Sequence, residues 1–257
     1  MRYLFALIAC LATPALAFAA VDEYLLAVTH DLPAVAKDAL QRIDGKPRQL
    51  LAVRGYIRAG QQLSSRWSWS AEEIRTYEAS QEYADLLAEI ALVRARFEAA
   101  SPGYSLYANT AARSLDLQLQ RWNSNKSVGV IAHRLQEAAQ RELARSTYPA
   151  HPDAKATLRF ADFLREWRPV PAAAPLAAPG LSLHGRSRAI DFQIEQDGRI
   201  IAPTEVAKVR SVWEGQGWAR RLAAAMRETR FVGPLQSPNE PWHYEYLPRP
   251  GAVGAKE

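Results

Sequence analysis

Two short motifs near the C-terminal end constrain the fold most, because together they supply the residues of a candidate metal site. The first reads Ser-Leu-His-Gly-Arg-Ser-Arg-Ala-Ile-Asp from position 182 and carries His184 and Asp191; the second reads Glu-Pro-Trp-His and carries Glu240 and His243. Two imidazoles and one carboxylate are a donor set suited to Zn²⁺, and three protein ligands leave a fourth position for water. A carboxylate beside that water is what a metallo-hydrolase needs as its base. The chain has five histidines, and two of them lie in these motifs.

The N-terminus predicts the compartment. Met1-Arg2 is a short positive region, residues 3–11 are an apolar run, and small residues at 15–17 or 17–19 offer a cleavage site. The run is too short for a membrane span, so residues 1–20 are predicted to be a secretory signal peptide and no transmembrane segment is expected. The mature protein is therefore predicted to be periplasmic or secreted. Cys10, the only cysteine, lies in this segment and leaves open either lipoprotein processing there or soluble processing at the later site. Cleavage at the later site would leave a chain without disulfides.

Composition adds little about partners. After cleavage about 237 residues remain, enough for one large domain or a small pair. Removing Arg2 from the 32 basic residues leaves 31 against 27 acidic ones. This modest excess suits an anionic polymer such as peptidoglycan or a membrane surface. No basic run is interleaved with aromatic residues, so no nucleic acid is expected, and the oligomeric state stays open.

Residues 21–100 are predicted to be a helical N-terminal region without chemistry of its own. Helices are expected at 33–44 and 47–63, and a long one is expected to open at Ser70. Ser70 and Glu73 form a capping box, and apolar residues then recur with helical spacing as far as Phe97. Ser101-Pro102-Gly103 should stop this helix.

Residues 101–249 are predicted to be a mixed domain, so the fold class is α+β: a small antiparallel sheet with flanking helices that carry the zinc site. Strands are expected at 104–109, 189–194 and 242–247, with a hairpin turn at 196–199 and a return strand from 200. Helices are expected at 113–123, 127–145 (capped by Ser127), 153–167 and 217–227. The Pro- and Ala-rich residues 168–181 could be a linker, but a loop that delivers the first motif is preferred. Residues 250–257 should be a disordered tail.

Strand alternation places the second motif. Trp242, Tyr244 and Tyr246 should share one face of their strand, which leaves His243 on the other face, where it can point into a cleft. Asp191 is also expected on a strand, and ligands on strands are held more firmly than ligands on loops.

These motifs resemble those of the zinc D-alanyl-D-alanine carboxypeptidases of the VanY and VanX type. Wider relatives of that family include phage L-alanyl-D-glutamate endolysins and the Hedgehog signalling domain. The shared pattern is Ser-x-His-x6-Asp followed by Glu-x-Trp-His. The resemblance implies that His184, Asp191 and His243 are the zinc ligands and that Glu240 is the catalytic base. It covers roughly residues 104–247.

An upstream segment extends the resemblance. The family has Ser-Gly-Tyr-Arg-Ser-x-x-x-Gln, and this chain matches its second part with Arg113, Ser114 and Gln118 but has Thr-Ala-Ala before the arginine. The match implies that Arg113 binds substrate and stabilises the oxyanion. Ser182 either binds substrate or orients its loop. Ser187 stands where the family has glycine, and it would be strained if that position has a positive φ, although Gly185 could take up the turn.

The resemblance implies a secreted zinc metallopeptidase that hydrolyses peptidoglycan stem peptides with a zinc-activated water. D-alanyl-D-alanine carboxypeptidase is the first expectation, and a D,D-, L,D- or L-Ala-D-Glu endopeptidase of the same fold remains open. Two other classes are a non-catalytic zinc-containing cell-wall binding module, which would not need Glu240, and a helical interaction protein whose zinc motif is accidental.

Overall fold

The computed structural model describes residues 14–145, 147–169, 176–236 and 239–249. Residues 1–13 of the predicted signal peptide, with Cys10, lie outside the described residues, as do 170–175 of the proline-rich segment and the predicted tail at 250–257. The α+β class is confirmed: a five-stranded antiparallel sheet is combined with flanking helices, and helices precede its first strand. The chain forms two compact units, each built from two stretches of sequence.

Unit 1 (residues 1–62 and 122–178) consists of helices. They are α1 (Pro14–Thr29), α2 (Ala34–Gln41), α3 (Lys46–Ala59) with the short turn η1 (Gly60–Gln62), α7 (Lys126–Leu143) and α8 (Ala154–Glu166). Helices α1 and α3 both pack against α7 and α8. Tyr24 of α1 is buried there, with its ring centroid 5.4 Å from that of Phe160. The predicted cap of α7 is wrong: Asn125, not Ser127, accepts the hydrogen bond from the backbone N–H of Val128.

Unit 2 (residues 63–121 and 179–257) begins with two helices where the sequence predicted one. The capping box of Ser70 and Glu73 is confirmed at the start of α4 (Ala71–Glu78). The helix is then interrupted at residues 79–80, and a second helix, α5 (Gln81–Ala100), follows. Ser80 stabilises the break because its hydroxyl accepts from the N–H of Tyr83 and donates to the carbonyl of Tyr77. One side chain therefore bonds a free backbone group at the end of α4 and another at the start of α5.

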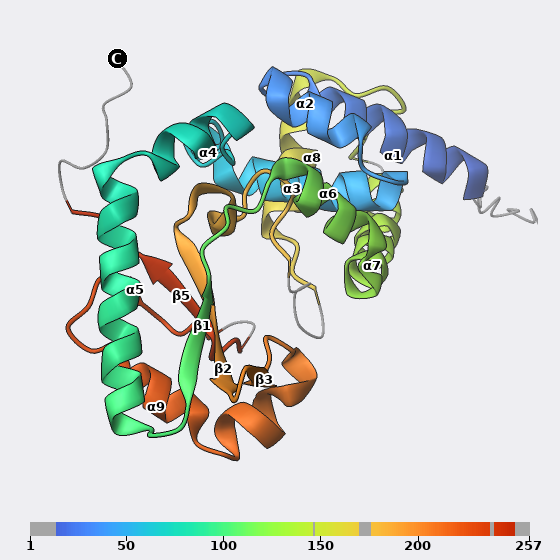
Figure 1. Cartoon of the computed structure of the whole chain (residues 1–257). Helices are drawn as coiled ribbons and strands as arrows, with labels where there is room; N and C mark the ends of the chain where they lie inside the picture. The colour runs from blue at the N-terminus through green and yellow to red at the C-terminus, as the bar shows by residue number, and fades with distance from the viewer. Residues whose placement is uncertain (1–13, 146, 170–175, 237–238, 250–257) are drawn as a thin grey trace, which may run out of the picture. The chain divides into compact units, whose positions relative to one another are not determined.

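The sheet has the order β1-β2-β5-β4, with β3 paired to the other end of β2 (Figure 1). Its strands are β1 (Ser105–Asn109), β2 (Ala189–Gln196), β3 (Arg199–Ala202), β4 (Phe231–Val232) and β5 (His243–Tyr246), and all pairs are antiparallel. Strand β4 and the helical turns η3 (Val206–Lys208) and η4 (Val209–Glu214) were not expected from the sequence. Strand β2 lies at the centre and contacts β1 along one edge and β5 and β3 along the other.

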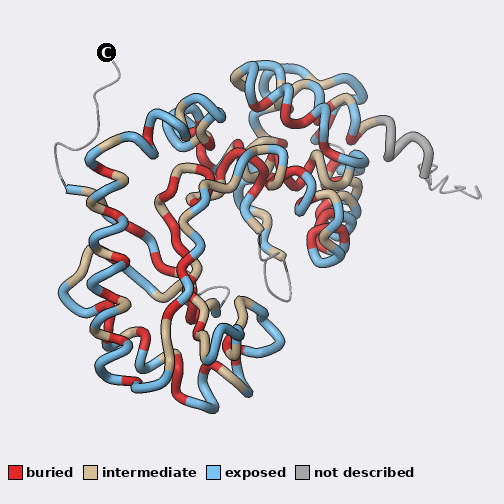
Figure 2. The backbone as a smooth tube through the Cα atoms, viewed as in Figure 1, coloured by how far each residue is buried: buried red, intermediate tan, exposed pale blue. Residues whose placement is uncertain are grey.

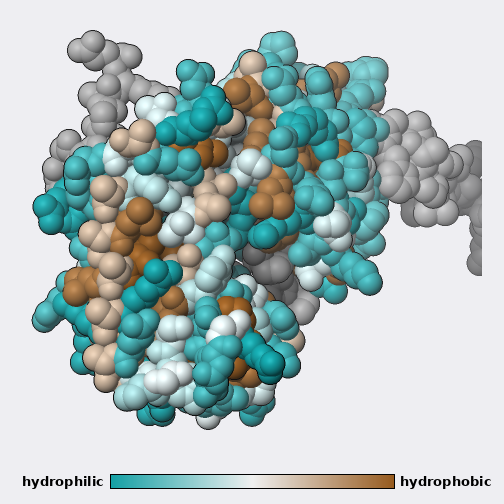
Figure 3. Space-filling view, in the orientation of Figure 1, coloured by the Kyte–Doolittle hydropathy of each residue, from teal (hydrophilic) through white to brown (hydrophobic). Residues whose placement is uncertain are grey.

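One face of the sheet forms the core of unit 2. Alternate residues of β2 and β5 are buried, and they pack with α5 and with α9 (Trp218–Ala225) (Figure 2). The core members include Ile90, Phe97, Phe192, Tyr244 and Leu222. The predicted alternation in β5 is confirmed, because Trp242, Tyr244 and Tyr246 are buried whereas Glu245 is exposed. Hydrophilic residues cover most of the surface in Figure 3, with hydrophobic patches beside α5.

The compact units do not follow the predicted boundary after residue 100. Helices α4 and α5 belong to unit 2, because the apolar stripe of α5 covers the sheet. Helices α7 and α8 lie between the strands in sequence but belong to unit 1, and α6 (Leu115–Ser124) runs across the division. The division between the two units falls between Ala178 and Pro179, within the segment predicted to be a linker or a loop. Among the described residues, no helix is both long and apolar enough to cross a membrane.

Candidate metal centre

The pairing of two strands brings Asp191 and His243 together. They are direct partners in the register of β2 and β5, and the N–H of Phe192 donates to the carbonyl of Trp242 beside them, at 3.0 Å. Directly opposed residues of an antiparallel pair have neighbouring side chains on the same face. Because Phe192 and Tyr244 point into the core, Asp191 and His243 point to the opposite face of the sheet.

His184 reaches the same place from a single helical turn, η2 (Leu183–Arg186). The turn is closed by the N–H of Gly185, which donates to the carbonyl of Ser182 at 2.9 Å. The N–H of Arg113 donates to the carbonyl of His184, also at 2.9 Å, so the loop before α6 fixes the backbone of the histidine. The first motif thus places one ligand on a short turn and the other on the strand that follows it.

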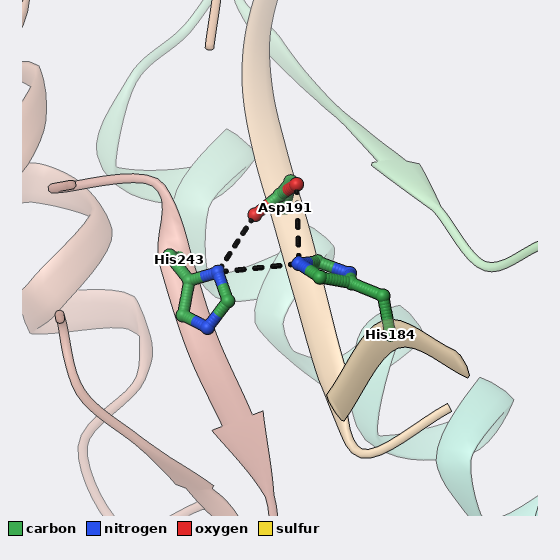
Figure 4. Close-up of side chains that lie close together, drawn as sticks. All are labelled: His184, Asp191 and His243. Carbon is green, nitrogen blue, oxygen red and sulfur yellow. Dashed lines mark hydrogen bonds and ion pairs between the residues drawn. The ribbon is translucent and has the colours of Figure 1, made fainter. Parts of the chain in front are cut away.

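The donor atoms of the three residues form a small triangle (Figure 4). His243 Nδ1 lies 3.0 Å from Asp191 Oδ1 and 3.3 Å from His184 Nε2, and His184 Nε2 lies 3.4 Å from Asp191 Oδ2. A tetrahedral ion with bonds of about 2.0–2.1 Å holds its ligands about 3.3 Å apart, and these separations, which involve both oxygens of Asp191, are of that size. The group formed by His184, Asp191 and His243 can therefore hold a metal ion.

The protonation states also suit a metal. Burial lowers the pKa of His184 to about 3, although the Asp191 carboxylate opposes this shift. Burial would raise the pKa of Asp191, but the hydrogen bond with His243 and the neighbouring positive charges hold it below its usual value. Near neutral pH the site thus presents a neutral imidazole and a carboxylate, the forms that coordinate metals.

Glu240 and Arg113 lie at the edge of this group. Glu240 Oε2 is 3.8 Å from His243 Nδ1, and the N–H of His243 donates to the Glu240 carbonyl at 3.0 Å, so a tight turn holds the second motif together. Burial raises the pKa of Glu240 above its ordinary value. The guanidinium of Arg113 donates to Asp191 Oδ2 at 3.3 Å, and both side chains are only 19% exposed.

A buried hydrogen-bond network beneath the site was not expected from the sequence. The Gln118 amide donates to the carbonyl of Arg113 and to the Ser68 hydroxyl, both at 2.8 Å, and accepts from the N–H of Gly180 at 3.0 Å. Ser68 in turn donates to the Gly180 carbonyl. The motif match of Gln118 was a signal for its importance, whereas nothing in the sequence marked Ser68. Together they connect the loop that carries Arg113 to the loop that leads into η2.

Gly185 is packed directly against this network and does not relieve the turn as expected. A Cβ at Gly185 would lie 2.1 Å from the Ser68 hydroxyl and 2.7 Å from the Gln118 amide nitrogen, so any larger residue would displace them. The left-handed position is Ser187 instead, with φ 50° and ψ 29°. The strain foreseen at Ser187 is therefore present, and the turn is accommodated there.

Replacing Ser187 with glycine is expected to stabilise the protein. A non-glycine residue in the left-handed region costs about 1–3 kcal/mol, and the greater freedom of glycine in the unfolded chain takes back about 0.4–1 kcal/mol. The free energy of unfolding, measured by urea titration, should therefore rise by about 1 kcal/mol, which is near the middle of the difference between these ranges. Ser211→Gly is the matched control, because Ser211 is exposed in helical backbone and glycine should destabilise there. Equal effects at the two positions would contradict the strain at Ser187.

The structure therefore brings His184, Asp191, His243, Glu240 and Arg113 to one place, with Ser182 in the backbone of the adjoining turn. The remaining histidines, His30, His133 and His151, are exposed, as predicted. Comparisons of this chain with protein-family models, with curated proteins and with solved structures find no match.

Proposed function

We propose that this protein is a secreted zinc metallopeptidase that hydrolyses peptidoglycan stem peptides. Among the activities of this kind, we propose that of a D-alanyl-D-alanine carboxypeptidase. The observation that carries the proposal is the position of Glu240 beside the donor triangle, 3.8 Å from the Nδ1 of His243. A site that only held a metal would have no use for a half-buried carboxylate there. The motif resemblance supports the same assignment, since the four residues occur in the order and spacing of that family.

His184, Asp191 and His243 would hold the zinc ion. When bound, the ion supplies Lewis acidity and lowers the pKa of a coordinated water toward neutrality. Two histidines with one carboxylate also serve non-haem iron enzymes, so the metal content of the purified protein must be measured. Zinc at near one equivalent is expected, and a protein purified without it would remove both zinc hypotheses, the peptidase and the binding module.

Glu240 would move the proton. Its carboxylate takes a proton from the attacking water and returns it to the amine that leaves when the peptide bond breaks. Burial raises the pKa of Glu240, which makes the carboxylate a stronger base than an exposed glutamate. A raised pKa also helps Glu240 to hold the proton at neutral pH after the water is deprotonated and before the leaving amine is protonated.

Arg113 would bind the oxygen that becomes negative during the reaction. Its guanidinium is held by Asp191, and its backbone is fixed by His184 and Gln118. A positioned cation near the developing charge stabilises the transition state without rearrangement. Arg113 is thus proposed to bind substrate and to assist catalysis.

The proposed compartment agrees with this substrate. Both cleavage positions of the signal peptide precede Val21, which is buried in α1 along with Tyr24. The mature chain would therefore retain these core residues. A protein exported in this way reaches the compartment that contains peptidoglycan.

Digestion of purified peptidoglycan, with products identified by mass spectrometry, tests the proposal. Glu240→Ala is expected to lower the hydrolysis rate by about 10²–10⁴ while zinc remains bound, because loss of a general base costs about that factor. Glu245→Ala is the matched control, since Glu245 is an exposed glutamate of β5, close to Glu240 in the sequence. Identical product profiles for wild type and Glu240→Ala would refute the peptidase and favour a zinc-containing binding module. Release of D-alanine identifies a carboxypeptidase, and release of crosslinked or stem fragments identifies an endopeptidase.

A further inference from the structure

A second feature of unit 2, separate from the residues of the metal centre, is a hollow between α5 and α9. Its volume is about 690 Å³, within the range of about 300–1,000 Å³ typical of small-ligand sites. Four arginines line it, against one glutamate, Glu228. Arg96 comes from α5, Arg220 and Arg221 come from α9, and Arg227 follows α9.

These four arginines lack acidic partners. Within the described part of the chain, none of their guanidinium groups forms an ion pair with a carboxylate. Arg96 donates to the backbone carbonyl of Arg227, and Arg221 lies over the ring of Trp218, 4.7 Å from its centroid. Some other arginines of the same unit are paired, for example Arg230 with Glu89. The hollow therefore concentrates positive charge that the described chain leaves uncompensated.

The position of two of these arginines at the start of α9 makes their positive charges more unfavourable. Arg220 and Arg221 are the third and fourth residues of the helix, and its first turn contains no acidic residue. The N-terminal end of a helix is its positive end, so cations there destabilise it and anions stabilise it. Gly217 precedes the helix and has no side chain to cap the first amide groups, and it also lines the hollow. Both the amides and the guanidinium groups are thus suited to an anion.

We propose that this hollow binds a phosphate group. Guanidinium groups bind phosphate oxygens in bidentate fashion, and the N-terminus of a helix is a ready site for the same group. A doubly charged oxyanion would compensate several arginines at once, which a single carboxylate cannot. The phosphate can belong to a free anion or to a phospholipid headgroup. This site adds to the proposed peptidase and does not depend on it.

Calorimetric titration with inorganic pyrophosphate, at ionic strength held constant with chloride, tests the proposal. The double variant Arg220→Gln/Arg221→Gln should bind at least about tenfold more weakly than wild type, because hydrogen bonds to charged groups are lost. The double variant Arg199→Gln/Arg210→Gln is the matched control, since it removes the same charge from exposed arginines elsewhere in unit 2 and should bind normally.

Thermal unfolding without anion separates this effect from misfolding. The Arg220→Gln/Arg221→Gln variant should melt roughly 1–3 °C higher than wild type, because the unfavourable charges at the start of α9 are gone. A variant that binds less yet is more stable cannot be explained by damage to the fold.

Sedimentation with vesicles distinguishes the two sources of phosphate. Binding to phosphatidylglycerol but not phosphatidylcholine vesicles, lost in the α9 variant and displaced by pyrophosphate, would assign a lipid headgroup. Pyrophosphate binding without vesicle binding would assign a free anion. Absence of pyrophosphate binding by wild type, or equal weakening in both double variants, would overturn the proposal.

Discussion

Replacement of His243 with alanine is expected to abolish metal binding and, with it, all detectable hydrolysis. His243 Nδ1 is 3.0 Å from Asp191 Oδ1 and 3.3 Å from His184 Nε2, so its removal opens one side of the donor triangle. Two ligands do not complete a zinc site that uses three protein donors. Metal analysis of the purified variant should give far less than one equivalent, whereas wild type should give about one.

The same substitution should lower stability through the lost metal. An ion present at a thousand times its dissociation constant stabilises the folded state by about 4 kcal/mol, and this contribution disappears with the site. His243→Ala should therefore unfold in urea near the midpoint of metal-free wild type and should not respond to added zinc. His133→Ala is the matched control, because His133 is an exposed histidine of α7. Retention of one zinc equivalent by His243→Ala would contradict the assigned ligand set.

The two motifs made this centre predictable, and strand periodicity added the face on which His243 lies. The alternation of aromatic and polar residues from Trp242 to Tyr246 fixes which face His243 occupies, and the registration of β2 with β5 then places it opposite Asp191. For the glycine-to-serine departure in the first motif, strain at Ser187 was expected only if that position had a positive φ, and its φ is 50°. The alternation is a local pattern, whereas the meeting of Asp191 and His243, 52 residues apart, was expected from the motif resemblance.

Features that depend on distant packing could not be predicted. The break at Ser80 leaves the apolar spacing of the helical stripe almost undisturbed, so periodicity alone joins α4 to α5. The assignment of α5 to the sheet unit, and of α7 to the other, depends on which surfaces pack together. Ser68 acquires its place beneath the site only through Gln118 and Gly180, which are far from it in the chain.

Acidification is expected to destabilise the metal-free protein because of His184. Its pKa is about 3 in the folded chain, lowered by burial from an ordinary value of 6.5. Between these pH values the unfolded chain binds a proton that the folded chain does not, so the free energy of unfolding falls as the pH drops from 6.5 toward 3. At pH 4.5 the loss from this residue should be about 2–3 kcal/mol relative to pH 7.5.

Other groups change the pH dependence in known directions. The lowered pKa of Asp191 removes stability only below its ordinary value of 3.8, whereas the raised pKa of Glu240 adds stability as the pH falls through its folded value. Subtracting the same measurements on His184→Asn cancels these contributions to first order, since asparagine does not titrate. Urea unfolding at pH 7.5 and 4.5, after removal of metal with a chelator, should give a drop in wild type that exceeds the drop in His184→Asn by about 2–3 kcal/mol. Equal drops would mean that His184 is as readily protonated in the folded chain as in the unfolded one. A histidine of that kind would have to be deprotonated before it could bind a metal below pH 6.5, whereas the buried His184 is already in its ligand form when the metal arrives.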